Sequence, residues 1–200
     1  MMNRTIIYRK RGFTLIELLV VIAIIGMLAS ILIPSIAGAF RSAKRARALS
    51  QIHDLDGAVK RYFAEYGKMP VPAGDNGGAD KLYTGADQAK VIEILINSPK
   101  RADTNQNPKK IVFLDLDPGS FMNAAGRPVK SVEDMQVLLK GGTPYKDPWG
   151  NDYGILMDLN FDEKISGTAG GFPDIRAKAA VYSLGEKGEE DKANPPFKTW

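Results

Sequence analysis

The hydrophobic pattern begins with one long apolar run. Between positions 13 and 33 the sequence has a single ionisable side chain, that of Glu17. A helix rises about 1.5 Å per residue, so this run would form a helix of about 30 Å, which matches the hydrocarbon core of a bilayer. The pattern predicts a membrane-spanning helix at residues 13–33.

A second pattern is a stripe with helical spacing. Apolar residues recur at alternating intervals of three and four, at Ile52, Leu55, Val59, Tyr62 and Tyr66. This spacing predicts an amphipathic helix with one buried face. Gly67 fits the position just after a helix end. One helix from Phe13 to Tyr66 would be about 80 Å long, and Pro34 is where it could bend.

The remaining sequence predicts a mixture of short helices and strands. Residues 67–85 are rich in Gly, Pro and Asp and predict a loop. A helix is expected from Thr84 or Asp87 to just before Ser98, and another from Ser131, its capping residue, to Leu139. Strands are expected at residues 109–116, after Tyr153 as far as about Met157, and at residues 177–184. The order predicts an α+β fold with a small antiparallel sheet.

Glu17 is an unusual residue for a membrane helix. A carboxylate at mid-bilayer costs about 2.5 to 3.5 kcal/mol on insertion scales, so Glu17 needs a cation or a place near the interface. A cut between Gly12 and Phe13 would create an α-amine, with a reference pKa of about 8, at the start of the helix. One proteolytic event would therefore supply a charge partner.

The segment Lys10-Arg11-Gly12-Phe13-Thr14-Leu15-Ile16-Glu17-Leu18 resembles the processing site of the type IV pilin and type II secretion pseudopilin superfamily. The resemblance implies that a prepilin peptidase cuts after Gly12 and methylates the amine of Phe13. It also implies that Glu17 pairs with the amine of a neighbouring subunit during filament assembly. Pro34 stands where that superfamily has a helix-perturbing proline.

Two C-terminal patches narrow the resemblance. Asp147-Pro148-Trp149-Gly150-Asn151, followed by Tyr153, and then Tyr182-Ser183-Leu184-Gly185 and a terminal tryptophan, resemble the major pseudopilins of type II secretion. The residues themselves indicate a turn that starts at Asp147 and carries Trp149 as a large anchor for a small core. The resemblance implies a pilin-like fold with a cleaved leader at 1–12, a transmembrane helix at 13–33 and a periplasmic domain at 34–200.

The function that this resemblance implies is structural. The subunit would wait in the inner membrane with its leader in the cytoplasm, and would then join a filament that drives protein export across the outer membrane. Its implied partners are the prepilin peptidase, copies of itself, minor pseudopilins and the inner-membrane assembly platform.

Two alternatives stay open. The first is a type IV pilin or minor pilin for adhesion, motility or DNA uptake, although the chain has no cysteine and so lacks the C-terminal cysteine pair common there. The second is a secreted enzyme or binding protein with residues 1–37 as a signal peptide. The mature N-terminus separates them, because a pilin would begin at Phe13 and the secreted protein at Gly38.

The positive net charge of the chain comes from the residues before position 13. The chain has 27 Lys and Arg against 23 Asp and Glu, a net charge of +4. Four of the basic residues, and no acidic one, precede position 13: Arg4, Arg9, Lys10 and Arg11. The mature chain is formally neutral, which gives no pervasive basic field for binding nucleic acid.

The run from Asp158 to Ile165 has two interpretations. Oxygen side chains alternate at Asp158, Asn160 and Asp162, with an apolar residue in eighth place, as at the start of an EF-hand-type calcium loop. The sixth and twelfth residues, Glu163 and Ala169, depart from that pattern, so a polar turn between strands is the other interpretation. The pseudopilin resemblance implies calcium in the loop after Leu184, where this chain has Lys187 in place of an acid, with Glu186, Glu189, Glu190 and Asp191 nearby.

No catalytic set is predicted. Val112-Phe113-Leu114-Asp115-Leu116-Asp117 is similar to the nucleophile strand of haloacid-dehalogenase-like phosphatases, but no doubly wound βαβ series follows it. His53 is the single histidine, and Ser120 with His53 makes no credible nucleophile and base. We therefore expect a protein that is not an enzyme.

Overall fold

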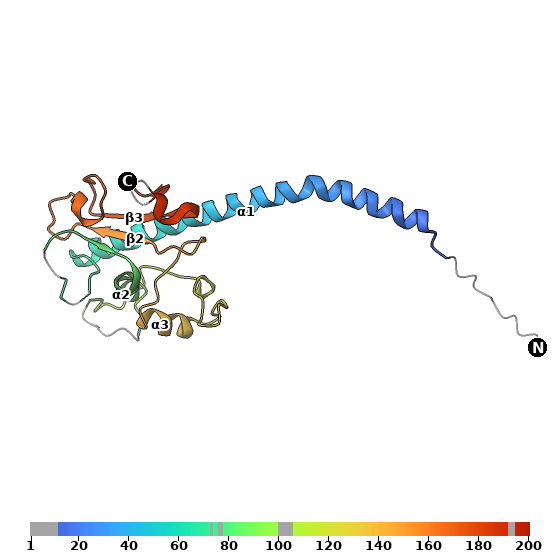
Figure 1. Cartoon of the computed structure of the whole chain (residues 1–200). Helices are drawn as coiled ribbons and strands as arrows, with labels where there is room; N and C mark the ends of the chain where they lie inside the picture. The colour runs from blue at the N-terminus through green and yellow to red at the C-terminus, as the bar shows by residue number, and fades with distance from the viewer. Residues whose placement is uncertain (1–11, 73, 76–77, 100–105, 192–194) are drawn as a thin grey trace, which may run out of the picture. The chain divides into compact units, whose positions relative to one another are not determined.

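The computed structural model describes residues 12–72, 74–75, 78–99, 106–191 and 195–200. The chain divides into two compact units, at Met1–Ala43 and Lys44–Trp200. We call the described part of the first, residues 12–43, the N-terminal segment, and the second the head. Helix α1, Leu15–Tyr66, contributes to both units (Figure 1). The rest of the expected leader, residues 1–11, lies outside the described residues.

The predicted long helix is confirmed. Helix α1 continues through positions 26, 34 and 38, where glycine or proline could have ended it. The side chain of Pro34 lies outside the described residues, so a bend there stays a prediction. Gly67 ends the helix as expected: it has a φ of +66, and its N–H donates to the carbonyl of Phe63 at 2.8 Å.

The predicted apolar stripe of α1 is the centre of the head. Ile52, Leu55, Val59 and Tyr62 are fully buried, and they pack with helix α2, Gly85–Leu95, and with the sheet. Helix α3, Val132–Lys140, begins as expected at Ser131, whose hydroxyl accepts the N–H of Asp134 at 3.1 Å. The 3-10 helices among the described residues are Pro118–Ser120, Gly167–Ala169 and Gly185–Asp191.

The sheet has four antiparallel strands in the order of the sequence. They are β1, Lys81–Tyr83, β2, Gly154–Met157, β3, Ala179–Ser183, and β4, Phe197–Lys198 (Figure 1). The register pairs Lys81 with Met157 and Gly154 with Tyr182. A helix packed on a small antiparallel sheet confirms the predicted α+β, pilin-like fold.

Both faces of the sheet are covered. Because side chains alternate along a strand, Ile155 and Met157 join the core beneath α1, while Leu156 joins a second cluster with Phe172 and Tyr182. Position 154 must be glycine, since a Cβ there would lie 2.1 Å from the ring of Tyr182. The burial of both faces of the sheet explains why β2 and β3 are apolar at successive positions.

The predicted strand at residues 109–116 is wrong. Residues 110–117 have no regular secondary structure, because their polar backbone groups find other partners. The N–H groups of Phe113 and Leu114 both donate to the carbonyl of Leu95 at the end of α2, at 2.8 and 3.2 Å. The carbonyl of Phe113 accepts a bond from Arg61 at 2.7 Å.

Two short strands were not predicted from the sequence patterns. Strand β1 lies inside the segment 67–85, which was expected to be entirely loop, and β4 lies in the polar tail. Strands of two and three residues carry too few positions for a period of two to show.

Candidate functional site

The junction between Gly12 and Phe13 lies just before α1. A Cβ at position 12 would meet no atom within 4 Å, and the Phe13 side chain is 74% exposed. The fold itself therefore makes no demand for glycine at position 12. A requirement for glycine there would have to come from an enzyme that reads this junction.

Glu17 and Thr14 form a reciprocal cap on the first turn of α1. The Thr14 N–H and hydroxyl donate to Oε2 of Glu17 at 2.8 and 2.7 Å, and the Glu17 N–H donates to the Thr14 hydroxyl at 3.3 Å. This is a capping box, in which two otherwise unpaired N–H groups are satisfied. The Thr-x-x-Glu spacing of this box is visible in the sequence, and the box gives Glu17 a hydrogen-bonded partner within its own chain.

The cap changes the interpretation of Glu17. Its carboxylate has a local partner before any cut at Phe13, and it lies in the first turn, where the helix dipole favours a negative charge. A second subunit's amine would then approach a carboxylate that is already oriented. The roles predicted for Gly12, Phe13 and Glu17 stay predictions.

The surface of the N-terminal segment is apolar on every side. Its exposed large hydrophobic side chains include Leu15, Ile16, Leu19, Ile22, Ile25, Met27, Ile31, Ile33, Ile36 and Phe40. Of the described helices, α1 alone is long and apolar enough to cross a membrane. This is consistent with a single-pass membrane anchor.

The two C-terminal motifs belong to one structure in the head. Asp147 is buried; its Oδ1 accepts the N–H groups of Trp149 and Asn151 at 2.9 and 2.8 Å, and its Oδ2 accepts the Ser183 hydroxyl at 2.7 Å. The Asn151 amide donates to the carbonyl of Gly185 at 2.7 Å. Asp147 therefore joins the turn before β2 to the end of β3.

Trp149 has a different position from the one that the sequence suggested. It is half-buried, and its ring stacks on Phe197 of β4 with 5.4 Å between ring centroids. It covers the edge of the head and does not fill the centre of the core. The centre is filled by Tyr62, Tyr83 and Tyr153, which are fully buried.

The loop proposed for calcium supports itself with its own hydrogen bonds. The two oxygens of Asp158 accept the N–H groups of Phe161 and Glu163 at 2.6 and 2.9 Å. Asn160 accepts the N–H of Asp162, and Asp162 that of Lys164, both at 2.9 Å. Ile165 is buried, as expected of an anchor.

This geometry fits the polar-turn interpretation. Burial raises the pKa of Asp158, and no ion pair among the described residues involves its carboxylate. Among the described residues no three His, Cys, Asp or Glu side chains gather as metal ligands. A residue that sequence analysis missed completes the turn: Asp80 accepts the N–H groups of Leu159 and Ser166 at 3.1 and 2.6 Å. Calcium at Asp158, Asn160 and Asp162 stays a prediction.

The other acidic and nucleophilic candidates are dispersed. Glu186 is exposed, and the side chains of Glu189, Glu190 and Asp191 lie outside the described residues. The Ser120 hydroxyl accepts a bond from Arg47 at 2.9 Å, and His53 is exposed. The phosphatase-like run has no strand geometry that would present Asp115 as a nucleophile.

Comparisons with known proteins agree with the processing motif. Residues 7–33 match the family described as "Prokaryotic N-terminal methylation motif". The chain is 44% identical over 148 residues to the type II secretion system core protein G of Escherichia coli (strain K12), a match that covers 74% of this chain and 72% of the relative.

Two further relatives carry the same name. The protein of Vibrio cholerae serotype O1 is 25% identical over 182 residues, which cover 91% of this chain and 84% of the relative. The protein of Pectobacterium carotovorum is 43% identical over 63 residues, so this chain spans only about two fifths of its length. No solved structure matches the chain significantly.

Proposed function

Because the chain belongs to the family of the type II secretion system core protein G, we propose that it is a structural subunit of a type II secretion pseudopilus. The 44% identity over most of both chains carries this proposal. The N-terminal segment, whose apolar side chains are exposed on every side of α1, and the methylation motif at residues 7–33 support it.

The proposed mechanism uses the two units differently. The N-terminal segment holds the subunit in the inner membrane, where a prepilin peptidase cuts after Gly12 and methylates Phe13. Glu17 then pairs with the new amine of a neighbouring copy, which offsets the cost of placing a carboxylate in the bilayer. The filament core is a bundle of these helices, and its growth from the assembly platform pushes proteins through the outer membrane. Minor pseudopilins are the remaining proposed partners.

The type IV pilin alternative has less support, since relatives matched over most of their length are secretion proteins. The secreted-protein alternative makes a different prediction for the mature N-terminus. Mass spectrometry of the membrane-bound protein should find N-methylated Phe13, whereas a signal peptide would leave Gly38.

The function is tested in the source bacterium with the gene deleted and the full chain restored. Deletion should abolish export of type II substrates, and the wild-type chain should restore both export and short filaments on overexpression. Gly12→Leu should leave the precursor uncut and export at the deletion level. Gly26→Ala is the matched control, because a Cβ there also meets nothing within 4 Å. Normal export in the deletion strain would contradict the proposed function.

A further inference from the structure

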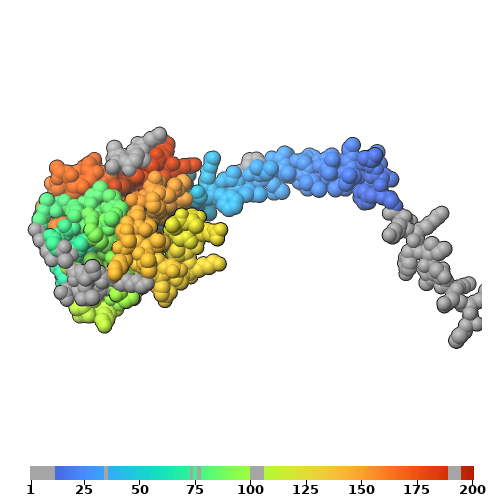
Figure 2. Space-filling model, turned by 60° about the horizontal axis from the view of Figure 1, so that its bottom comes forward, coloured from blue at the N-terminus to red at the C-terminus, as the bar shows by residue number. Residues whose placement is uncertain are grey.

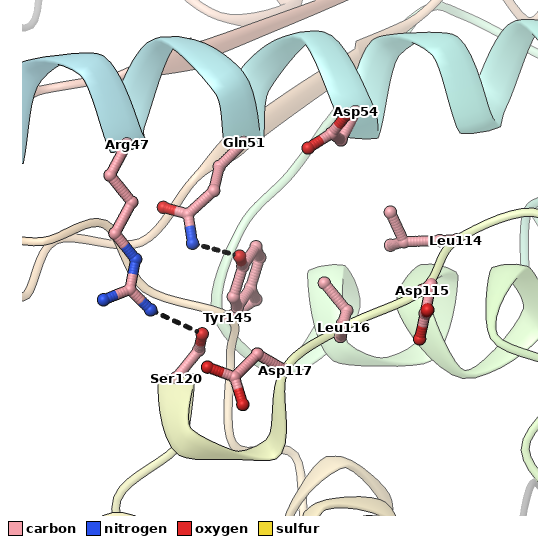
Figure 3. A pocket seen from close by; sticks show the side chains of 9 residues that line it. All are labelled: Arg47, Gln51, Asp54, Leu114, Asp115, Leu116, Asp117, Ser120 and Tyr145. Atoms are coloured by element: carbon pink, nitrogen blue, oxygen red, sulfur yellow. Dashed lines mark hydrogen bonds between the residues drawn. The ribbon is translucent and has the colours of Figure 1, made fainter.

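The segment 112–117, which we call the acidic loop, has no part in the function proposed so far. Its exposed residues give it an outer surface: Val112 is 60% exposed and Asp115 and Asp117 are exposed, while Phe113, Leu114 and Leu116 are buried. The Asp115 carboxylate points away from α1 (Figure 3). The loop thus presents an apolar side chain together with two carboxylates.

The acidic loop forms one wall of a cleft of about 280 Å³, with α1 as the other wall (Figure 3). Arg47, Gln51 and Asp54 line the helix side, so a third carboxylate faces the loop. Burial raises the pKa of Tyr145 at the base of the cleft to about 12, so its hydroxyl stays neutral. The segment around residue 120, yellow in Figure 2, lies at the surface of the head.

A second recess has the opposite charge, and we call it the basic groove. It has a volume of about 390 Å³ and an apolar floor that includes Val59, Phe63 and Met69. Three cations line it, at Lys60, Arg176 and Lys178. The Lys178 ammonium lies 4.5 Å from the centre of the Phe63 ring, which holds it at the edge of the floor.

The two surfaces lie on opposite sides of α1. At about 100° per residue, the mean direction of Arg47, Gln51 and Asp54 is about 160° from that of Val59, Lys60 and Phe63. An open filament of identical subunits needs two different, complementary surfaces on different sides of each copy. The acidic loop and the basic groove meet that requirement in charge, in apolar content and in position.

We propose that the acidic loop of one head docks in the basic groove of a second copy, a contact that rests on the proposed filament function. Asp115 and Asp117 pair with Arg176 and Lys178, and Val112 covers the apolar floor beside Phe63.

The first test uses the absence of cysteine, because engineered thiols are then the only ones in the chain. Full-length Asp115→Cys and tagged Arg176→Cys copies are expressed together, and sheared filaments are treated with a short bifunctional thiol cross-linker. We expect tagged, mixed dimers from this pair. The control pair, Asp134→Cys with Arg176→Cys, uses an exposed residue of α3 and should give only background.

The second test is a charge exchange. Asp115→Arg and Arg176→Asp should each lower the filament yield, and one chain that carries both should recover it, because every copy contributes both surfaces. We expect recovery of at least about tenfold over either single variant, the change that corresponds to about 1.4 kcal/mol. Unchanged melting of all three variants would exclude misfolding as the cause.

The outcomes separate this contact from the function itself. Normal filaments and export with mixed dimers no more frequent than in the control pair would overturn the contact and leave the proposed function intact. Failure of the exchanged chain to recover, with both single variants impaired, would overturn it too. A wild-type chain that forms no filaments and supports no export would overturn both proposals.

Discussion

The N-terminal segment and the head use the same helix and the same residue types with opposite results. In the N-terminal segment Leu15 and Ile33 are 87% and 66% exposed, whereas in the head Ile52 and Leu55 of the same α1 are fully buried. The difference lies in the arrangement of apolar residues, which surround the helix before position 34 and follow one stripe after position 51. Helix formation is common to both units, and the distribution of apolar side chains decides which surroundings each requires.

The largest expected effect is the loss of filament assembly on removal of the Glu17 carboxylate from the apolar N-terminal segment. Glu17→Leu removes a carboxylate that costs about 2.5 to 3.5 kcal/mol to insert, so the variant should enter the membrane at least as well as wild type. Assembly should fall more than about 100-fold, because removing one partner of a buried pair costs about 3 to 5 kcal/mol. Membrane fractionation and filament yield measure the two effects.

Thr14→Ala sharpens this experiment. It removes the capping hydroxyl, at a cost of about 1 kcal/mol, and keeps the carboxylate that the neighbouring amine needs. We expect a small loss of assembly. Wild-type export by Glu17→Leu would contradict the proposed pairing of Glu17 with a neighbouring amine.

The corresponding break in the head is Asp147→Ala. The substitution leaves the N–H groups of Trp149 and Asn151 and the Ser183 hydroxyl without their acceptor. Buried polar groups that lose partners cost about 1 to 3 kcal/mol each, so we expect the free energy of unfolding of the head to fall by about 3 kcal/mol. Denaturant unfolding of residues 44–200 measures it.

Asp152→Ala is the matched control for Asp147. Asp152 pairs with Lys146 at 3.3 Å across a partly exposed surface, where such pairs contribute about 0 to 1 kcal/mol. Equal losses in the two variants would contradict the view that Asp147 joins the two motifs.

Calcium binding, if it occurs as predicted, should change the free energy of unfolding of the head by no more than Asp147→Ala does. A ligand that binds only the folded head at about 100 times its Kd adds about 2.7 kcal/mol of stability. Melting of the head with calcium, with magnesium and with chelator should then show a calcium-specific rise that Asp162→Ala abolishes. Identical melting in all three buffers would leave the hydrogen-bonded turn as the full explanation of Asp158, Asn160 and Asp162.

The comparison also shows what the sequence could and could not predict. The apolar run, the stripe from Ile52 to Tyr66 and the helix end at Gly67 follow from local periodicity and capping, so they were predictable. The strand expected at 109–116 failed because the carbonyl of Leu95 and the side chain of Arg61, both distant in sequence, satisfy its backbone. No local pattern encodes such contacts.

The candidate sites divide in the same way. Gly12, Phe13 and Glu17 stand in one short motif, whereas the bond from Ser183 to Asp147 joins residues 36 positions apart. Asp80 supports the loop at Asp158 from across the fold, and no spacing rule could have found it. The cap between Thr14 and Glu17 was predictable, because its Thr-x-x-Glu spacing lies within one turn of the helix.

The smallest expected effect is a pH dependence of the free energy of unfolding of the head, which arises from Asp158 in its buried turn. Burial raises the pKa of Asp158, and the N–H groups of Phe161 and Glu163 oppose that rise without cancelling it. Between the unfolded pKa of about 3.9 and the higher folded value, the folded head holds a proton that the unfolded chain releases. This contribution to stability is complete below the unfolded pKa and is lost as the pH rises through the folded pKa.

Asp158→Asn cannot titrate and carries only a constant offset from its altered hydrogen bonds. In chelator, the free energy of unfolding of wild type relative to Asp158→Asn should therefore fall as the pH rises from about 3.5 to 7. A relative stability that rises over this range would mean that the folded pKa is lowered, as a bound cation or an ion pair at Asp158 would cause.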